Sequence, residues 1–301
     1  MADFHDKTLM RTAYMCEVSK AAGIEYTVNY KHVDLYINDN YNGTYLLTDK
    51  VEKGNNRIKV NDDGYLIEND GYYQQEPLYF LTDSFNYGYS FKYPDPDDGE
   101  ISFNDDNFSF IVRFMNELEQ ELLKLKEIDN DEFINKIDLE SFAKWYITAE
   151  LTATRDPNFY YVLTSKNSKL KMMPIWDAEW SLGLWPTFAG HDPYLEMKDI
   201  AYWKNGKYFS CLFNNKTFIK VLQSEWNKFK GNTSEIKDNI NKTIELIRYS
   251  QEDDFKIWSN TRNQYKLNLS FEQWEENIKY INAFFDDRVI WMDSYIMNLN
   301  R

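Results

Sequence analysis

The sequence predicts an α+β fold in two lobes: a small mixed N-terminal lobe with an antiparallel sheet, and a larger, mostly helical C-terminal lobe. Three observations predict it. After one helical stretch at residues 8–22, apolar and polar residues alternate with the period of strands between residues 26 and 68. A loop-forming segment at residues 93–99 then interrupts the chain. Beyond it, apolar residues recur mostly at helical spacing.

The N-terminal lobe is expected to begin with a helix over residues 8–22. Asp6 or Thr8 can cap its start, and Gly23 can end it. After this helix the alternation of side chains predicts an antiparallel sheet, in which an Asn- and Gly-rich turn joins the first two strands. The predicted strands cover residues 33–37, 44–48 and 64–68.

The Pro-, Asp- and Gly-rich segment at residues 93–99 is the predicted boundary between the lobes. Residues 1–98 are therefore assigned to the N-terminal lobe, and residues 99–301 to the C-terminal lobe. The predicted helices of the second lobe cover residues 108–125, 139–151, 218–229 and 236–249, followed by a long final helix that runs from Phe271 to Met292. A short hairpin, residues 159–163 and 170–175, is expected among them.

Composition limits the classes of partner. Apolar residues make up 43% of the 301, which is enough for a sizeable core. The net charge of −15 repels polyanions, so nucleic acid and anionic membranes are not expected partners. No apolar stretch reaches the roughly 20 residues that a membrane span needs. Cys16 and Cys211 are expected as two buried free thiols.

Candidate chemistry is concentrated in two stretches about twenty residues apart. The first presents Asp156 and Asn158 in a loop after a helix, and the second delivers Asp177 and Glu179 after the hairpin. This order follows the logic of a protein-kinase site, in which a loop carboxylate orients the acceptor hydroxyl and a second carboxylate chelates magnesium. Hard cations prefer such oxygen ligands. A polar loop followed by two solvated acids is the alternative without function.

A carbohydrate-active site is a further alternative. Asp177 and Glu179 are spaced to point to the same side of a strand, and tryptophans flank them. Two such carboxylates could serve as the acid and the nucleophile of a retaining hydrolase, with the tryptophans stacking on sugar. A sugar-binding module would use the same aromatic walls.

Motifs along nearly the whole chain resemble the CotH family of spore-coat-type atypical protein kinases. Several separate matches occur in the family's order, which makes the combination more specific than any one motif. The matching segments are residues 6–11 for D-x-[ST]-x-x-R, 41–51 for Y-x-G-x-Y-x-L-x-E-x-[IV], 150–160 for N-x-D…NFY, 174–183 for P-x-W-D-x-D-x-x-x-G and 288–291 for R-x-x-W.

The resemblance implies a two-lobed protein-kinase-like fold that uses ATP and Mg²⁺ or Mn²⁺ to phosphorylate serine. The substrate would be a partner protein with Ser-rich segments or the chain itself. By position, Asp156 would be the catalytic aspartate and Asp177 the metal-binding aspartate, with Asn158 and Glu179 as further candidate metal ligands.

The resemblance also implies which residues lie near the nucleotide. They would be Glu68, Lys50 and Lys92, although a structural ion pair is the alternative role for each lysine.

This chain departs from the family pattern at several positions. Glu179 stands where the family usually has aspartate, Asp49 where it has glutamate, and Thr154 where it often has asparagine. Asn158 follows Asp156 by only two residues. The departures predict a rival function: a catalytically weak or inactive kinase-like module that acts in extracellular adhesion or assembly.

Family members usually carry a strand or more before the D-x-[ST] motif, which here begins at Asp6. The chain is therefore expected to be truncated at its N-terminus and to come without its signal peptide. The resemblance implies that the parent protein lies outside the cell, or at the cell or spore surface.

Overall fold

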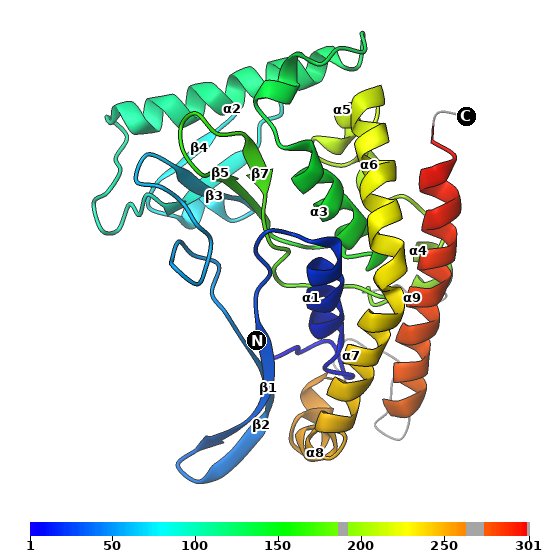
Figure 1. Ribbon diagram of the computed structural model, residues 1–301. Helices are drawn as coiled ribbons and strands as arrows, with labels where there is room; N and C mark the ends of the chain where they lie inside the picture. Colours follow the sequence, from blue (N-terminus) through cyan, green and yellow to red (C-terminus); the bar gives the residue numbers. More distant parts are fainter. Residues whose placement is uncertain (186–191, 263–273, 300–301) are drawn as a thin grey trace.

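The computed structural model describes residues 1–185, 192–262 and 274–299. Figure 1 shows a sheet-containing part beside a body of roughly parallel or antiparallel helices. The helices are α1 (Arg11–Ala22), α2 (Asp106–Lys124), α3 (Leu139–Leu151), α4 (Pro193–Met197), α5 (Phe209–Leu212), α6 (Lys216–Phe229), α7 (Thr233–Ile247), α8 (Ser250–Arg262) and α9 (Trp274–Met297). The strands are β1 (Tyr30–Ile37), β2 (Asn40–Thr48), β3 (Tyr65–Asn69), β4 (Tyr79–Leu81), β5 (Gly88–Tyr93), β6 (Phe159–Leu163) and β7 (Leu170–Met172). The predicted α+β class is confirmed.

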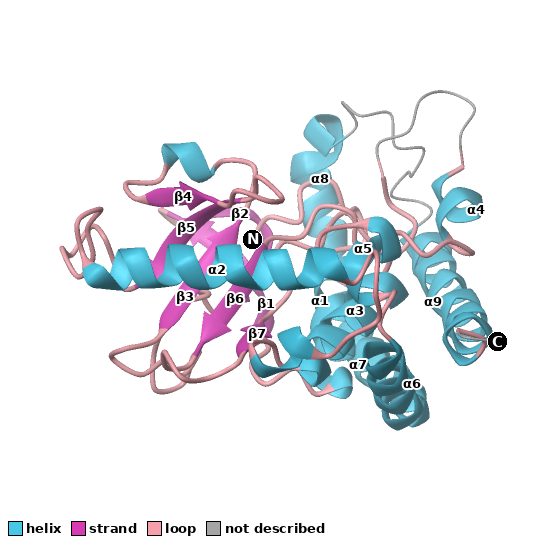
Figure 2. Ribbon diagram, turned by 90° about the horizontal axis from the view of Figure 1, so that it is seen from above, coloured by secondary structure: helices cyan, strands magenta, loops and turns pink. Residues whose placement is uncertain are grey.

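The larger sheet has five antiparallel strands in the order β4-β5-β3-β6-β7. Every residue of β3 and β6 is buried, as expected for central strands that are covered on both faces. Figure 2 shows α2 lying across one face of the sheet. Phe108 of α2 packs its ring against Phe80 and Phe91 of the sheet, so this face is closed by aromatic contacts.

Helix α3 is the centre of the helical body. It contacts α1, α6 and α9 as well as β7, and most of its residues are buried. Helix α1 is also almost wholly buried, although its sequence is only weakly amphipathic, because α3, α6 and α7 surround it. An N-terminal helix thus lies inside the body that the later helices form (Figure 1).

Strands β1 and β2 form a separate hairpin, which extends away from the larger sheet and packs against α8 (Figure 1). The two strands were predicted, and both are longer than the prediction. Strand β7 is shorter than the predicted 170–175 and ends at Met172. Pro174 has no N–H to donate to a ladder, and an isolated bridge between Asn158 and Trp176 follows.

The predicted helices over residues 108–125, 139–151, 218–229 and 236–249 are present as α2, α3, α6 and α7, with ends that differ by up to three residues. The final helix is present as α9, while its predicted start at Phe271 lies outside the described residues. Strands β4 and β5 and helices α4, α5 and α8 were not predicted. Cys16 and Cys211 are both free and buried, as expected.

The predicted division of the chain at residues 98 and 99 stays a prediction. Strand β6 pairs with β3 in the same sheet, and α1 packs on α3 and α7, so contacts join the two segments both in the sheet and in the helical body. None of the helices that the structure describes combines the length and the apolar character that a bilayer crossing requires.

Candidate active site

The two acidic stretches are brought side by side by one bridge between extended segments. The backbone N–H of Asn158 donates to the carbonyl of Trp176 at 3.3 Å, just before β6 begins and after β7 ends. Asp156 therefore lies two residues before this bridge and Asp177 one residue after it. The bridge therefore places these two stretches side by side, although they are about twenty residues apart in the sequence.

Asp177 has an unusual backbone and an acidic neighbourhood. Its φ of 59° lies in the left-handed region, which a residue other than glycine rarely adopts and which often marks a functional site. Its side chain is exposed at the surface. Desolvation by surrounding protein atoms raises its pKa first, and the negative charges of Glu179 and Asp156 raise it further. Two negative charges thus act on Asp177, which is where a cation would be stabilised.

Asp156 is exposed, and the chain around it is held firmly. Arg155 N–H donates to the carbonyl of Trp180 at 3.0 Å, and the indole of Trp203 donates to the carbonyl of Thr154 at 2.8 Å. In the part of the chain that the structure describes, no hydrogen bond or ion pair reaches the Asp156 carboxylate. The carboxylate is therefore available to a ligand while its backbone is fixed.

A buried ion pair anchors the helix that leads into this loop. Arg288 of α9 lies 3.1 Å from the carboxylate of Glu150 near the end of α3, and both side chains are almost completely buried. The Glu150 carboxylate also accepts from the backbone N–H groups of Tyr202 and Trp203, each at 2.8 Å. The R-x-x-W motif at residues 288–291 thus contributes an anchor beneath the loop that carries Asp156.

Glu179 is already engaged. One of its oxygens lies 2.6 Å from Nδ1 of His5, and the other accepts from the backbone N–H of His5 at 3.0 Å. Both carboxylate oxygens therefore hold the N-terminal segment, and a metal could use Glu179 only by competing with His5. His5 was not predicted, because it is 174 residues away from Glu179 in the sequence.

The D-x-[ST]-x-x-R motif, residues 6–11, contacts the loop that follows Glu179. Asp6 accepts hydrogen bonds from the backbone N–H groups of Thr8, Met10 and Arg11, from the Thr8 hydroxyl and from the Arg11 guanidinium. Burial alone would raise the pKa of Asp6, but Arg11 and these hydrogen bonds hold it below its usual value. Arg11 Nε then donates to the carbonyl of Ser181 at 2.9 Å, which fixes the chain just after Glu179.

Glu68, Lys92 and Asn158 form one connected group. Glu68 is buried on the central strand β3, and its two oxygens are taken by Asn158 Nδ2 and by Lys92 Nζ, the latter at 2.8 Å. Burial would lower the pKa of Lys92, but Glu68 and then Glu76 outweigh it and raise the pKa. Tyr160 adjoins the same carboxylate, and burial followed by the Glu68 charge raises the pKa of its phenol. Asn158 thus ties the bridge to the ion pair.

A pocket of about 440 Å³ opens beside this group. Lys50 and Lys92 both line it, together with Tyr160 and Trp176, so both lysines expected near a nucleotide face one cavity. Glu68 does not line the pocket and instead holds Lys92 at its wall. Lys50 differs from Lys92 in being largely exposed, with only a 3.9 Å contact to Glu52.

A divalent cation fits part of the predicted ligand set. Among residues 1–185, 192–262 and 274–299, no three His, Cys, Asp or Glu side chains are already grouped as metal ligands. Asp156 and Asp177 have solvent-facing carboxylates beside one another's charge, which suits a hard cation. Asn158 and Glu179, by contrast, are bound to Glu68 and His5.

The comparisons with known proteins agree with the motifs. The family model described as CotH kinase protein matches residues 1–292 of the chain, so the predicted resemblance is confirmed. A search of curated proteins finds no match.

Proposed function

The chain belongs to the CotH family, and from this premise we propose that it is an ATP-dependent protein kinase domain. It would transfer the γ-phosphate to a serine of a partner protein, or to a serine of the chain itself. Ser-rich segments are the expected acceptors. With a net charge of −15, the chain favours protein acceptors over nucleic acid.

The observation that carries this proposal is the bridge between Asn158 and Trp176. It puts Asp156 and Asp177 on the same edge, and Trp176 also lines the pocket that contains Lys50 and Lys92. Four acids, Glu52, Glu76, Asp95 and Asp97, line this pocket together with the two lysines. Lysines that can face phosphates, beside exposed acids that can orient an acceptor and hold a cation, support phosphoryl transfer.

Each residue has a role in the proposed reaction. Asp156 orients the serine hydroxyl and accepts its proton, while the serine oxygen attacks the γ-phosphorus and the bond to the β-phosphate oxygen breaks. Lys92 and Lys50 face the phosphates, and Glu68 holds Lys92 in place. Mg²⁺ or Mn²⁺ held by Asp177 would neutralise charge on the phosphate oxygens.

Replacement of Asp156 tests the proposal. Asp156→Asn should lower ATP-dependent phosphate incorporation by a factor on the order of 10² or more, because it removes the proton acceptor. The fold should be retained, since Asp156 is exposed. Incorporation of labelled phosphate and the melting temperature are measured together, with Asp39→Asn at the exposed hairpin turn as a matched control. Equal incorporation by Asp156→Asn and the wild type would refute the assignment.

A catalytically weak or inactive module is the second candidate, and the His5–Glu179 contact favours it. Glu179 stands where the family usually has aspartate and is bound through both oxygens. ATP titration followed by thermal stability separates the two functions, because a ligand that binds only the native state raises its melting temperature. A shift that needs both ATP and Mg²⁺ supports the kinase. No shift at millimolar ATP supports a module for adhesion or assembly outside the cell or at the cell or spore surface.

A further inference from the structure

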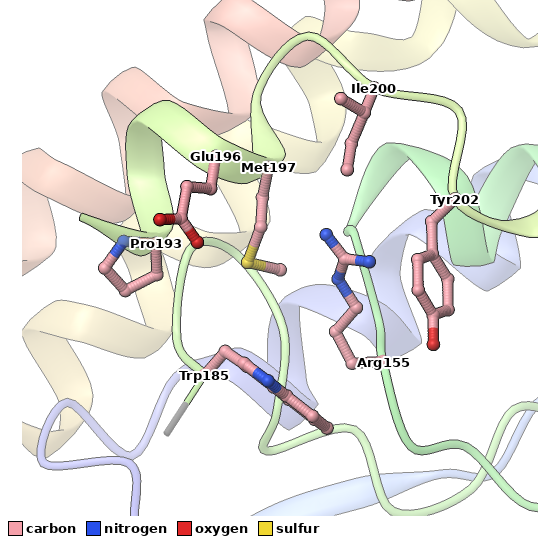
Figure 3. A pocket seen from close by; sticks show the side chains of 7 residues that line it. All are labelled: Arg155, Trp185, Pro193, Glu196, Met197, Ile200 and Tyr202. Carbon is pink, nitrogen blue, oxygen red and sulfur yellow. The ribbon is translucent and has the colours of Figure 1, made fainter. Parts of the chain in front are cut away.

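A second pocket opens next to Asp156 and is separate from the pocket that contains Lys50 and Lys92. It has a volume of about 280 Å³, and Arg155 lies in its wall (Figure 3). Apolar and aromatic side chains make up most of the rest of the lining, among them Trp185, Met197, Ile200 and Tyr202. Because Arg155 and Asp156 are consecutive, their Cα atoms are only about 3.8 Å apart. The wall of the pocket therefore begins one residue away from Asp156.

The Arg155 side chain is held in place before any ligand binds. Its guanidinium lies over the ring of Tyr202, 3.9 Å from the centroid, and the backbone N–H of Arg155 donates to the carbonyl of Trp180. Tyr202 is itself tied through its backbone N–H to Glu150. A guanidinium stacked on an aromatic face keeps its N–H edge available for a planar fork of hydrogen bonds.

Arg155 has no carboxylate partner in the described part of the chain, although the sequence holds 49 acidic against 34 basic residues. The nearby Glu150 is occupied by Arg288 and by two backbone N–H groups. Glu196 lines the same pocket, but in Figure 3 it lies on the other side of Met197 from Arg155. Burial lowers the pKa of Arg155 without removing its charge. A half-buried cation thus faces the pocket without a direct ion pair among the described residues, and Glu150 and Glu196 act on it only through their charge.

We infer that this pocket binds an oxyanion-bearing side chain of the acceptor protein, close in sequence to the serine that is phosphorylated. The shared chemistry is a carboxylate or a phosphate, which a guanidinium binds through two parallel hydrogen bonds. The apolar walls reduce competition from water. This inference rests on the proposed function, which places the acceptor serine at Asp156.

The test measures peptide binding to the chain of residues 1–301 without ATP. Labelled peptides of one sequence carry a single central serine, and alanine, glutamate or phosphoserine is placed in turn at each position within three residues of it. At one position or more, the anionic peptides should bind the wild type on the order of tenfold more tightly than the alanine peptide. A larger effect for phosphoserine assigns the site to phosphate, and an equal effect assigns it to carboxylates.

Variants connect the preference with Arg155. Arg155→Met should abolish it, while Arg113→Met, which removes the same charge from an exposed position on α2, should retain it. Arg155→Lys keeps the charge and most of the packing but loses the fork, so the preference should fall several-fold even if Arg155→Met fails to fold. Equal binding of all peptides to the wild type, or an unchanged preference in both Arg155 variants, overturns the inference.

The outcome is independent of phosphate transfer. If the chain incorporates no phosphate and the Arg155-dependent preference is present, the proposed kinase activity fails and the pocket stands as a site for anionic peptides. If the chain incorporates phosphate and shows no preference, the kinase stands and the pocket fails.

Discussion

Lys92 and Lys50 line the same pocket, but they differ in exposure and in their ion pairs. Lys92 is mostly covered and lies 2.8 Å from a carboxylate that is itself buried on β3. Lys50 is largely exposed, and its nearest carboxylate is 3.9 Å away. An exposed pair contributes little to stability, whereas a buried carboxylate that loses its cation is costly.

Lys92→Met should lower the free energy of unfolding by about 1 to 3 kcal/mol, because Glu68 would keep its burial and lose its cation. Lys50→Met should stay within about 0.5 kcal/mol of the wild type. Urea denaturation of both variants measures the difference. Equal effects would show that Glu68 does not depend on Lys92.

At the scale of single residues, the motifs identified the acids but not their partners. Asp156 and Asp177 could be chosen because their spacing and order resemble those of a family. His5, which occupies Glu179, and Arg155, which lines the second pocket, gave no comparable signal. The partner of a carboxylate depends on which distant side chain packs against it, and no local pattern contains that information.

At the scale of elements, the hairpin β1–β2 is held to α8 through a glycine. Gly43 has a φ of 109°, and a Cβ there would lie 2.5 Å from Nε1 of Trp258 and 2.8 Å from Oδ1 of Asp254. The same two side chains form hydrogen bonds to the hairpin. The indole N–H of Trp258 donates to the carbonyl of Asn42, and the carboxylate of Asp254 accepts from the backbone N–H of Thr44. Any side chain at residue 43 must displace these contacts.

Gly43→Ala should therefore loosen the hairpin. We expect a loss of about 1 to 3 kcal/mol, from backbone strain and from the close contacts with Trp258 and Asp254. Hydrogen exchange at the Thr44 amide measures the opening, since the hairpin can separate from α8 without global unfolding. Gly71→Ala is the matched control, because a Cβ there meets no heavy atom within 4 Å, and it should leave this exchange unchanged.

Elements with a strong period were the ones that could be predicted. Helices α2, α6 and α7 each carry an apolar stripe, and their existence follows from local spacing. Strands β4 and β5 were missed, because the first is only three residues long and the second is buried along most of its length and does not alternate. Short or fully buried strands lack the period that a sequence pattern needs.

At the scale of the whole molecule, the sheet and the helical body each take elements from both sides of residue 98. Strand β3 pairs with β5 on one side and with β6 on the other. Helix α1 is buried by α3, α6 and α7. The pairing of β3 with β5 lies within residues 1–98, whereas the pairing of β3 with β6 and the burial of α1 need residues beyond 98.

A fragment of residues 1–98 should therefore fail to fold. Without β6 the central strand β3 loses a neighbour, and without α3 and α7 the buried face of α1 meets water. The measurement is the dispersion of amide NMR signals and the cooperativity of urea unfolding, compared with residues 1–301. A dispersed spectrum and a cooperative transition for the fragment would contradict this expectation and support an independent N-terminal lobe.

The sequence by itself determined the fold class, the main helices, the first hairpin and the family, because these depend on periods and motifs within short windows. Tertiary structure alone decided three contacts: the bridge between Asn158 and Trp176, the ion pair of Lys92 with Glu68, and the hydrogen bond of His5 with Glu179. The physical reason is that a buried charge is stabilised by whichever partner the packing of distant elements brings to it. Contacts of this kind are set by how the sheet and the helical body close together.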